Sequence, residues 1–123
     1  MQQAMLCRTL AGNHCHVLTI TGKGTDEQKL ARKGVFISAR IHPGESNSSF
    51  MMKGIIDFLT SDAPEARVLR DKFYFKLVPM LNVDGVVNGN YRCSLAGADL
   101  NRRWKAPMKA IFPEIWEIKK MCR

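Results

Sequence analysis

Two nearly continuous runs of hydrophobic residues stand out in the middle of the chain. Residues 35–41 read Val-Phe-Ile-Ser-Ala-Arg-Ile, and residues 72–80 read Lys-Phe-Tyr-Phe-Lys-Leu-Val-Pro-Met. Runs of this kind are typical of strands that are covered on both faces, as in parallel sheets. An earlier stretch, residues 16–21, is rich in β-branched and apolar residues and predicts a third, shorter strand.

The segment between the two long runs has the period of helices instead. A helix is predicted over about residues 48–59, with Gly54 in its middle as a position of tight packing. A second helix is predicted over residues 65–71, with Asp62 as its N-cap and Pro64 in its first turn. The residues expected on the buried face of the first helix are Met51, Ile55, Phe58 and Leu59.

The order of these elements predicts the fold class. Two strands joined by about 30 residues of helical pattern form a βαβ unit, in which the strands run parallel. Residues 1–14 are poorly patterned, and residues 81–105 hold many turn residues. We therefore expect an α/β fold with a mixed, largely parallel sheet and helices on both faces. A final helix is predicted from about Pro113, anchored by Ile115, Ile118 and Cys122.

The overall composition is that of a single globular domain. The chain has 123 residues, of which 46% are hydrophobic and 24% charged, so it has enough apolar residues for a core. No run approaches the roughly 20 apolar residues of a membrane span, and residues 1–7 lack the pattern of a secretory signal. We therefore expect a cytosolic protein with no membrane partner, whose four cysteines are reduced thiols.

The net charge of +8 suggests an anionic partner. Nucleic acid, an anionic surface and an acidic substrate would each suit a basic protein. The basic residues are nevertheless spread along the chain, and the tightest group, at residues 102–105, is short. No stretch interleaves aromatic and basic residues as nucleic-acid binding would require, so we expect no nucleic-acid partner.

The turn after the first long hydrophobic run carries the first candidate site. His42 and Glu45 flank the pair Pro43-Gly44, which lets the chain bend so that an imidazole and a carboxylate can face one point. This pair of ligand types suits zinc, which in catalytic sites typically takes three protein ligands and a water. The alternative is an ordinary tight turn in which Glu45 or Ser46 caps the next helix.

A second pair of histidines lies earlier in the chain. His14 and His16 are two residues apart, so a strand would place both side chains on one face. A metal pair is one interpretation of this spacing. A polar strand face is the favoured one, because no third ligand is near in the sequence.

The loop after residues 72–80 should reach the same edge of the sheet as the His42 turn, because parallel strands end on one side. It is rich in amide, carboxylate and guanidinium groups. Beside zinc, such groups would suit a substrate with a carboxylate, since Arg holds a carboxylate through two parallel hydrogen bonds. The alternative is that they are solvated loop residues. The polar residues are Asn82, Asp84, Asn88, Asn90, Arg92, Asp99, Asn101, Arg102 and Arg103.

Three ordered blocks resemble a known enzyme family. The first is His-Pro-Gly-Glu-Ser-Asn-Ser-Ser at residues 42–49, and the second is Leu-Val-Pro-Met-Leu-Asn-Val-Asp-Gly-Val at 77–86. The third is Gly-Asn-Tyr-Arg-Cys-Ser-Leu-Ala-Gly at 89–97, followed by Asp-Leu-Asn-Arg-Arg-Trp at 99–104. Together they resemble the zinc carboxypeptidases of the cytosolic type, which remove glutamates from tubulin and other proteins. The resemblance covers residues 34–105 and extends more loosely to both ends.

The resemblance implies a zinc cofactor and a role for three residues around it. His42 and Glu45 would be the first two zinc ligands. Asp99 would accept the second ring N–H of His42 and so fix the tautomer that faces the metal.

The resemblance also implies how substrate would be held. Arg92 would polarise the scissile carbonyl and stabilise the negative charge that develops on its oxygen. Asn101 and Arg102 would hold the terminal carboxylate, which distinguishes an exopeptidase from an endopeptidase. The implied partners are glutamate-rich protein tails, of tubulin first, in a cytoplasmic enzyme associated with microtubules or cilia.

The chain departs from the family pattern at several positions. Val83 stands where the family usually has proline, a change that removes no chemical group. No histidine follows His42, whereas the family has a third zinc ligand and a general-base glutamate further downstream. Glu114 and Glu117 lie in an amphipathic helix pattern and are interpreted as solvated carboxylates.

These departures predict an incomplete carboxypeptidase fold. Residues 1–15 would be the tail end of a preceding β-rich domain, and residues 16–123 the N-terminal half of the catalytic domain. Such a chain is expected to be inactive alone. Two other functions are kept as alternatives: a zinc deacylase of amino-acid conjugates, which shares the His/Glu pair, and a non-catalytic module that binds acidic tails.

Overall fold

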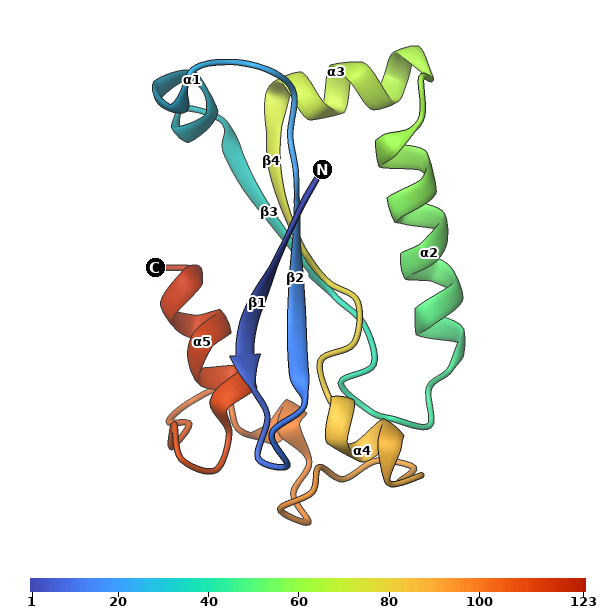
Figure 1. Cartoon of the computed structure of the whole chain (residues 1–123), viewed down its shortest axis with the longest axis vertical. Coiled ribbons are helices and arrows are strands. Elements are labelled where there is room, and N and C mark those ends of the chain that lie inside the picture. The colour runs from blue at the N-terminus through green and yellow to red at the C-terminus, as the bar shows by residue number, and fades with distance from the viewer.

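One sheet of four strands forms the centre of the molecule (Figure 1). The strands are β1 (Gln2–Arg8), β2 (His14–Ile20), β3 (Lys33–Ser38) and β4 (Phe73–Val78). In this computed structural model, which describes residues 1–123, their spatial order is β1-β2-β4-β3. The β1/β2 and β2/β4 pairs are antiparallel and the β3/β4 pair is parallel. The predicted α/β class with a mixed sheet is therefore confirmed, but only one of the three strand pairs is parallel, so the sheet of this chain is not largely parallel.

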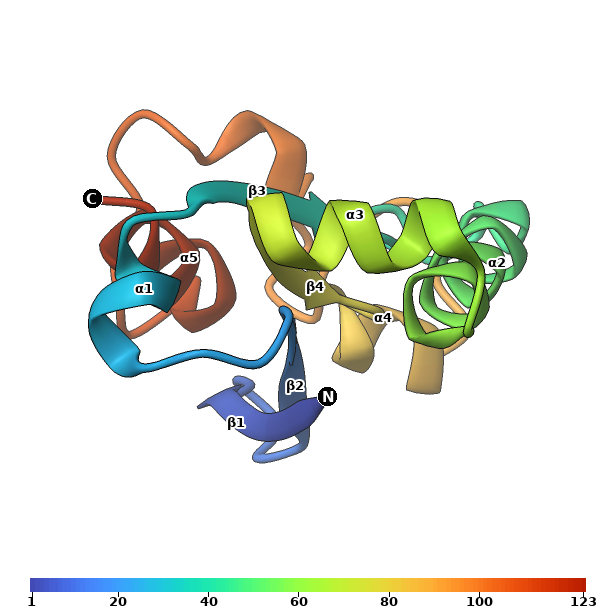
Figure 2. The same ribbon diagram turned by 90° about the horizontal axis from the view of Figure 1, so that it is seen from above.

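Helices cover both faces of this sheet (Figure 2). Two of them, α2 (Asn47–Thr60) and α3 (Pro64–Lys72), lie on one face, and α5 (Pro113–Met121) lies on the other. The remaining helices are short: α1 (Asp26–Leu30), α4 (Val83–Val87) and the 3₁₀ helix η1 (Leu100–Arg102). None of the helices is both long enough and apolar enough to cross a membrane.

Each face of the sheet has its own apolar core. Successive residues of β4 serve different cores: Leu77 is buried on the α2 face and Val78 on the α5 face. This explains why the sequence of β4 is apolar without alternation. The buried residues are Cys15, Val17, Val78, Leu81, Leu100, Phe112, Ile115 and Ile118 on the α5 face, and Leu18, Ile20, Ala39, Met52, Leu59, Phe75 and Leu77 on the α2 face.

The predicted β3-α2-α3-β4 unit is confirmed, and its strands continue to pair beyond their ends. Ala39 N donates to Val78 O at 3.0 Å, and Leu81 N donates to Ala39 O at 2.9 Å. One step further, Asn82 N donates to Arg40 O at 3.0 Å. The two chain segments that leave the parallel strands are therefore held side by side at one edge of the sheet.

The first strand was not predicted from the sequence. Most of β1 is exposed, and its sequence, Gln-Gln-Ala-Met-Leu-Cys-Arg, has no clean alternation of polar and apolar residues. Pairing with β2, which places Ala4 opposite Val17, is what makes it a strand. Residues 1–15 thus supply an edge of this sheet and the turn that follows. The assignment of these residues to a preceding β-rich domain stays a prediction.

The predicted helix at residues 48–59 is confirmed as α2, but only half of its predicted buried face is. Leu59 is buried and Ile55 packs against the core, as predicted. Met51 and Phe58, in contrast, are 69% and 43% exposed, and Met52 is buried instead. Apolar residues occupy positions on two neighbouring faces of this helix, so the period alone could not choose between them. The expected tight packing at Gly54 was also wrong, because a Cβ there would have no atom within 4 Å.

The ends of the other two long helices differ slightly from expectation. The N-cap of α3 is Ala63 rather than Asp62, and Pro64 occupies its first turn as predicted. Ile115 and Ile118 anchor α5 as predicted, but Cys122 is exposed. All four cysteines are free thiols.

The buried carboxylate of Asp84, on α4, forms hydrogen bonds with the turn between β1 and β2. Asp84 is only 4% exposed, and it accepts hydrogen bonds from three donors in residues 9–13. Thr9 Oγ1 and Asn13 Nδ2 donate to Asp84 Oδ1 at 2.5 and 2.9 Å, and Ala11 N donates to Oδ2 at 2.9 Å. Asp84 thereby ties the turn between β1 and β2 to the segment that follows β4.

Glu114 contradicts the interpretation that the carboxylates of the last helix are solvated. It is 5% exposed, and burial together with the nearby charge of Asp84 raises its pKa from 4.5 to about 7. Glu117 is partly exposed and forms an ion pair with Lys109 at 3.2 Å. The helical period placed Glu114 correctly on a helix, but it does not show which distant elements, such as β1, pack against that helix.

We expect the stability of the chain to fall as the pH rises from about 4.5 to 7. In that interval the unfolded chain releases the Glu114 proton while the folded chain still holds it, so higher pH favours unfolding. The shift corresponds to about 3 kcal/mol in total. Glu114→Gln should remove this slope and make the chain more stable than the parent at pH 8. Urea unfolding at pH 4.5 to 8 measures it, with Glu117→Gln as the control that keeps the slope. An equal difference between parent and Glu114→Gln at every pH would refute the assignment.

Candidate active site

Three segments meet at the edge of the sheet where the parallel strands end, beside α4 in Figure 1. The turn after β3 contributes residues 40–46, the segment after β4 contributes Asn82, and the loop after α4 contributes residues 90–102. Gly44 N donates to Tyr91 O at 2.7 Å, and Asn82 Nδ2 donates to Ile41 O at 3.2 Å. The first bond holds the turn against the loop, and the second holds the turn against the segment after β4.

Glycine is required at two points of this contact. A Cβ on Gly44 would lie 2.3 Å from a ring carbon of Tyr91, and one on Gly85 would lie 2.4 Å from Pro43 Cγ. Either contact is far shorter than van der Waals separation, so the close approach of the two segments depends on the missing side chains. Packing of the turn against the neighbouring segments therefore requires glycine at these two motif positions.

His42 and Glu45 face each other across the turn, as the sequence predicted. His42 Nδ1 lies 3.0 Å from Glu45 Oε1. The imidazole is buried, at 8% exposure, whereas the Glu45 side chain is about half exposed. Two ligand atoms on one tetrahedral zinc ion, each about 2.1 Å from it, lie about 3.4 Å apart. The separation in this chain is close to that value.

A second carboxylate occupies the other side of the same ring. His42 Nε2 lies 3.1 Å from Asp99 Oδ1, so carboxylate oxygens flank both ring nitrogens. A neutral imidazole can donate to only one of them. When Nε2–H donates to Asp99, the lone pair of Nδ1 points at Glu45, and a proton or a metal cation between them relieves the repulsion. The donor set thus fits zinc at Nδ1 and Oε1.

A catalytic zinc usually takes three protein ligands. Nowhere in the chain do three or more His, Cys, Asp or Glu side chains gather in a way that could hold a metal ion. Binding of zinc by His42 and Glu45, as two of three ligands, stays a prediction.

Asp99 connects His42 to Arg92. The Nε and Nη2 atoms of Arg92 both donate to Asp99 Oδ2 at 2.9 Å, and Asn101 N donates to Oδ1 at 2.8 Å. Burial of Asp99 opposes ionisation, but the hydrogen bonds from Asn101 and His42 and the charge of Arg92 outweigh it and lower its pKa. An ionised Asp99 therefore orients an imidazole and a guanidinium at once.

The structure brings four of the six predicted site residues into one hydrogen-bonded group: His42, Glu45, Asp99 and Arg92. Asn101 and Arg102 lie next to this group, on η1, with exposed side chains. Asn101 Oδ1 accepts a hydrogen bond from Trp104 Nε1 at 2.9 Å. Binding of a substrate carboxylate by these two residues stays a prediction.

Arg40 was not among the residues predicted for the site. It is the only residue other than glycine with a positive φ, at 55°. Its Nε donates to Pro43 O at 2.9 Å and its Nη1 donates to Ser49 Oγ at 3.0 Å, so the side chain bridges the turn from its start to the beginning of α2. A charged residue at the end of an apolar strand was the only signal in the sequence.

Two substitutions at Arg40 should separate the free-energy cost of its backbone conformation from the stabilisation that its hydrogen bonds provide. Arg40→Ala loses both bonds and keeps the positive φ, so we expect a loss of about 2 kcal/mol in unfolding free energy. Arg40→Gly loses the same bonds but tolerates the φ, and should cost about 1 kcal/mol less. Urea unfolding of the two variants and the parent measures both effects. Equal stability of the alanine and glycine variants would contradict the account.

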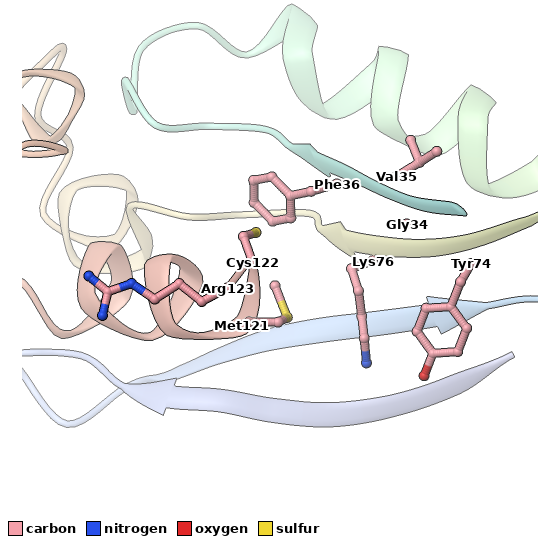
Figure 3. A pocket seen from close by; sticks show the side chains of 8 residues that line it. All are labelled: Gly34, Val35, Phe36, Tyr74, Lys76, Met121, Cys122 and Arg123. Carbon is pink, nitrogen blue, oxygen red and sulfur yellow. The ribbon is translucent and has the colours of Figure 1, made fainter. Parts of the chain in front are cut away.

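A hollow separate from the candidate site lies near the C-terminus of the chain. The hollow drawn in Figure 3, of about 390 Å³, lies between β3, β4 and the C-terminal end of α5. Its walls include Phe36, Tyr74, Lys76 and Met121. Neither this hollow nor four others, of about 100 to 420 Å³, is lined by His42, Glu45 or Asp99.

Comparison with known proteins agrees with this geometry. A family model described as zinc carboxypeptidase matches residues 2–120. Cytosolic carboxypeptidase 2 of Mus musculus is 56% identical over 119 residues, which are 96% of this chain and 14% of that protein. Cytosolic carboxypeptidase 1 of Danio rerio is 50% identical over 126 residues, covering 98% of this chain and 11% of that protein.

Solved structures show the same fold. A metallo-carboxypeptidase from Burkholderia cenocepacia superimposes with a TM-score of 0.88 at 36% identity, covering 98% of this chain and 32% of that one. The chain thus spans about a third of such a structure, and about a seventh of the length of the mouse relative. Because the family model matches nearly the whole sequence, the chain belongs to the zinc carboxypeptidase family.

Proposed function

We propose that the protein containing this chain is a zinc metallocarboxypeptidase that removes glutamates from the C-termini or side chains of proteins such as tubulin. The observation that carries the proposal is the group in which Asp99 links His42, beside Glu45, to Arg92. A metal-ligand pair and an anchored guanidinium within one hydrogen-bonded group are two of the parts that zinc-dependent peptide hydrolysis needs. The relatives named cytosolic carboxypeptidases support the same reaction.

In this proposal, His42 Nδ1 and the Glu45 carboxylate hold zinc. When bound, zinc would supply Lewis-acid polarisation of the scissile carbonyl and make an attacking water more acidic. Asp99 keeps the proton of His42 on Nε2, so that Nδ1 stays available as a ligand. Arg92, held by the same carboxylate, presents its guanidinium to the negative charge that develops on the substrate carbonyl oxygen.

The substrate class is proposed from charge. Asn101 and Arg102 would hold the terminal carboxylate, and the adjacent Arg103 and Lys105 are exposed cations that would attract further carboxylates. The net charge of +8 would favour the approach of an acidic tail at low ionic strength. We further propose that the protein acts in the cytoplasm, in association with microtubules or cilia.

The test uses the native polypeptide that contains residues 1–123. It is incubated with a peptide ending in several glutamates, and glutamate release is followed by mass spectrometry. A peptide of the same length ending in lysines is the matched control, and 1,10-phenanthroline removes zinc. We expect release from the acidic peptide only, and only without the chelator.

Other outcomes of this experiment separate the alternative functions. Hydrolysis of acyl-amino acids without peptide cleavage would identify a zinc deacylase. Salt-sensitive binding of the acidic peptide without cleavage, unchanged by the chelator, would identify a binding module for acidic tails. Either result would refute the proposed peptidase.

The 123-residue chain by itself is predicted to hold zinc weakly and to release no glutamate. With two protein ligands, most of the coordination shell is water, so we expect a zinc Kd weaker than about 1 μM. Calorimetric titration of the chain and of its His42→Ala variant measures the contribution of this pair. A zinc Kd below about 1 μM for the chain, together with loss of this binding in His42→Ala, would show that two protein ligands suffice.

A further inference from the structure

His14 and His16 lie on β2, outside the candidate active site and unused by the proposed reaction. Their rings are 5.8 Å apart between centroids and nearly perpendicular. The His14 residue is exposed and His16 is half buried, and neither ring forms an ion pair. Two imidazoles without acidic partners are thus held on one face of a strand.

The two rings share a hollow that has room for an ion and its waters. This hollow has a volume of about 330 Å³ and is otherwise lined by uncharged residues. No Lys, Arg, Asp or Glu side chain lines this hollow, and Arg8, which lies opposite His14 on β1, donates to Gly12 O. The lining residues are Gln3, His14, His16, Leu18, Pro79, Met80 and Val83.

Gln3 holds the ring of His16 from the neighbouring strand. The nitrogen Nε2 of the Gln3 amide lies 3.3 Å from His16 Nδ1, and a half-turn of the amide would put its oxygen there instead. An amide can present either its oxygen or its nitrogen to a ring atom. With the oxygen presented, Gln3 accepts from Nδ1–H and leaves the lone pair of Nε2 free. This is the arrangement in which a metal-binding histidine is commonly held by a hydrogen-bond partner.

The spacing of the rings suits one shared ion. An imidazole nitrogen is about 1.1 Å from its ring centroid, and bonds to zinc are about 2.0–2.1 Å, so the centroid lies about 3.2 Å from a bound ion. Two rings on one tetrahedral ion therefore have centroids about 5.2 Å apart, and rings on opposite sides of an ion about 6.4 Å apart. The observed 5.8 Å lies between these values, so a small rotation of the exposed His14 ring would let both rings share one ion.

We propose that His14 and His16 form a second metal site, which binds a divalent transition-metal ion such as Ni²⁺, Cu²⁺ or Zn²⁺. Imidazole nitrogens suit these metals, whereas Mg²⁺ and Ca²⁺ require oxygen ligands. Two protein ligands, with water completing the shell, give an affinity in the micromolar range or weaker. The site does not depend on the proposed peptidase activity, because it shares no residue with the His42 group.

Ni²⁺ is the probe for the test, because it binds imidazole without oxidising the four cysteine thiols. The chain has only three histidines, so single variants assign every imidazole resonance in an NMR spectrum. We expect the His14 and His16 resonances to broaden together on addition of Ni²⁺. Calorimetry should show at least tenfold weaker Ni²⁺ binding in His14→Ala and in His16→Ala, and unchanged binding in Asp57→Ala, a control on exposed helix surface.

Gln3→Ala tests the supporting hydrogen bond. This variant should weaken Ni²⁺ binding severalfold while both histidines remain, since it removes only the group that orients His16. Far-UV circular dichroism of every variant checks that the sheet is intact. The proposal is overturned if either single histidine variant, folded, binds Ni²⁺ as tightly as the parent. It is also overturned if His42→Ala alone abolishes binding.

Discussion

Replacing Asp99 with alanine in the native polypeptide is expected to lower kcat/KM for a glutamate-tailed peptide about 1000-fold. The carboxylate orients both His42 and Arg92, so its loss acts on metal binding and on catalysis together. Removing the hydrogen-bond partner of a metal-binding histidine typically costs 10- to 100-fold in affinity. Misplacing a group that stabilises the developing oxyanion typically costs 10²- to 10³-fold in kcat. Both losses, of zinc affinity and of kcat, arise from the same missing carboxylate. The total loss in kcat/KM should therefore be smaller than their product.

Three measurements distinguish this role from a merely structural one. Zinc content should fall in Asp99→Ala, and kcat should fall more than KM rises, because Arg92 acts on the transition state. Asp99→Asn keeps the shape and one acceptor oxygen, and should lose less. Asp62→Ala is the matched control, since Asp62 is almost fully exposed and contacts only Arg67. Full zinc occupancy and activity within tenfold of the parent in Asp99→Ala would exclude the assigned role.

The parts of the fold that depend on local pattern could be predicted from the sequence. The apolar runs gave β3 and β4, and the helical segment between them gave α2, α3 and the parallel pairing. The turn itself was predicted from Pro43-Gly44. Its position beside the loop after β4 was predicted from the topology, because parallel strands end on one side of a sheet. These predictions were confirmed because each rests on residues that are near one another in the chain.

The features that were missed depend on contacts between distant residues. Strand β1 exists because β2 lies beside it, and Glu114 is buried because elements far away in the sequence cover it. The choice between two neighbouring apolar faces of α2 was decided by the sheet, which the helix sequence does not contain. A period identifies a helix, but the packing partner decides which side is buried.

The candidate site, too, could be predicted from local sequence only in part. Imidazole and carboxylate flanking Pro43-Gly44 suggested a metal pair, and family resemblance added Arg92 and Asp99. The hydrogen bonds by which Asp99 holds both His42 and Arg92 join residues up to 57 positions apart, and no spacing rule predicts them. Arg40 was missed because its importance lies in its backbone angle and in two bonds within the turn.

Asp84→Ala is expected to cost the chain about 4 kcal/mol of unfolding free energy. It leaves the hydroxyl of Thr9, the N–H of Ala11 and the amide of Asn13 without their acceptor. An unsatisfied buried donor costs about 1–3 kcal/mol, and removal of the side chain adds a small cavity. The substitution also removes the repulsion that raises the pKa of Glu114, but that is a smaller cause of the shift than burial.

Two further variants test this balance of effects. Asp84→Asn keeps an acceptor for Thr9 but turns an N–H₂ group towards Ala11 N–H, so it should cost about half as much. Asp57→Ala, whose carboxylate pairs with Lys53 on exposed helix surface, should change stability by less than about 0.5 kcal/mol. Urea unfolding at pH 7 measures all three. If Asp84→Ala lost no more than Asp57→Ala, relief of the Glu114 repulsion would have offset three hydrogen bonds, and the turn would not depend on Asp84.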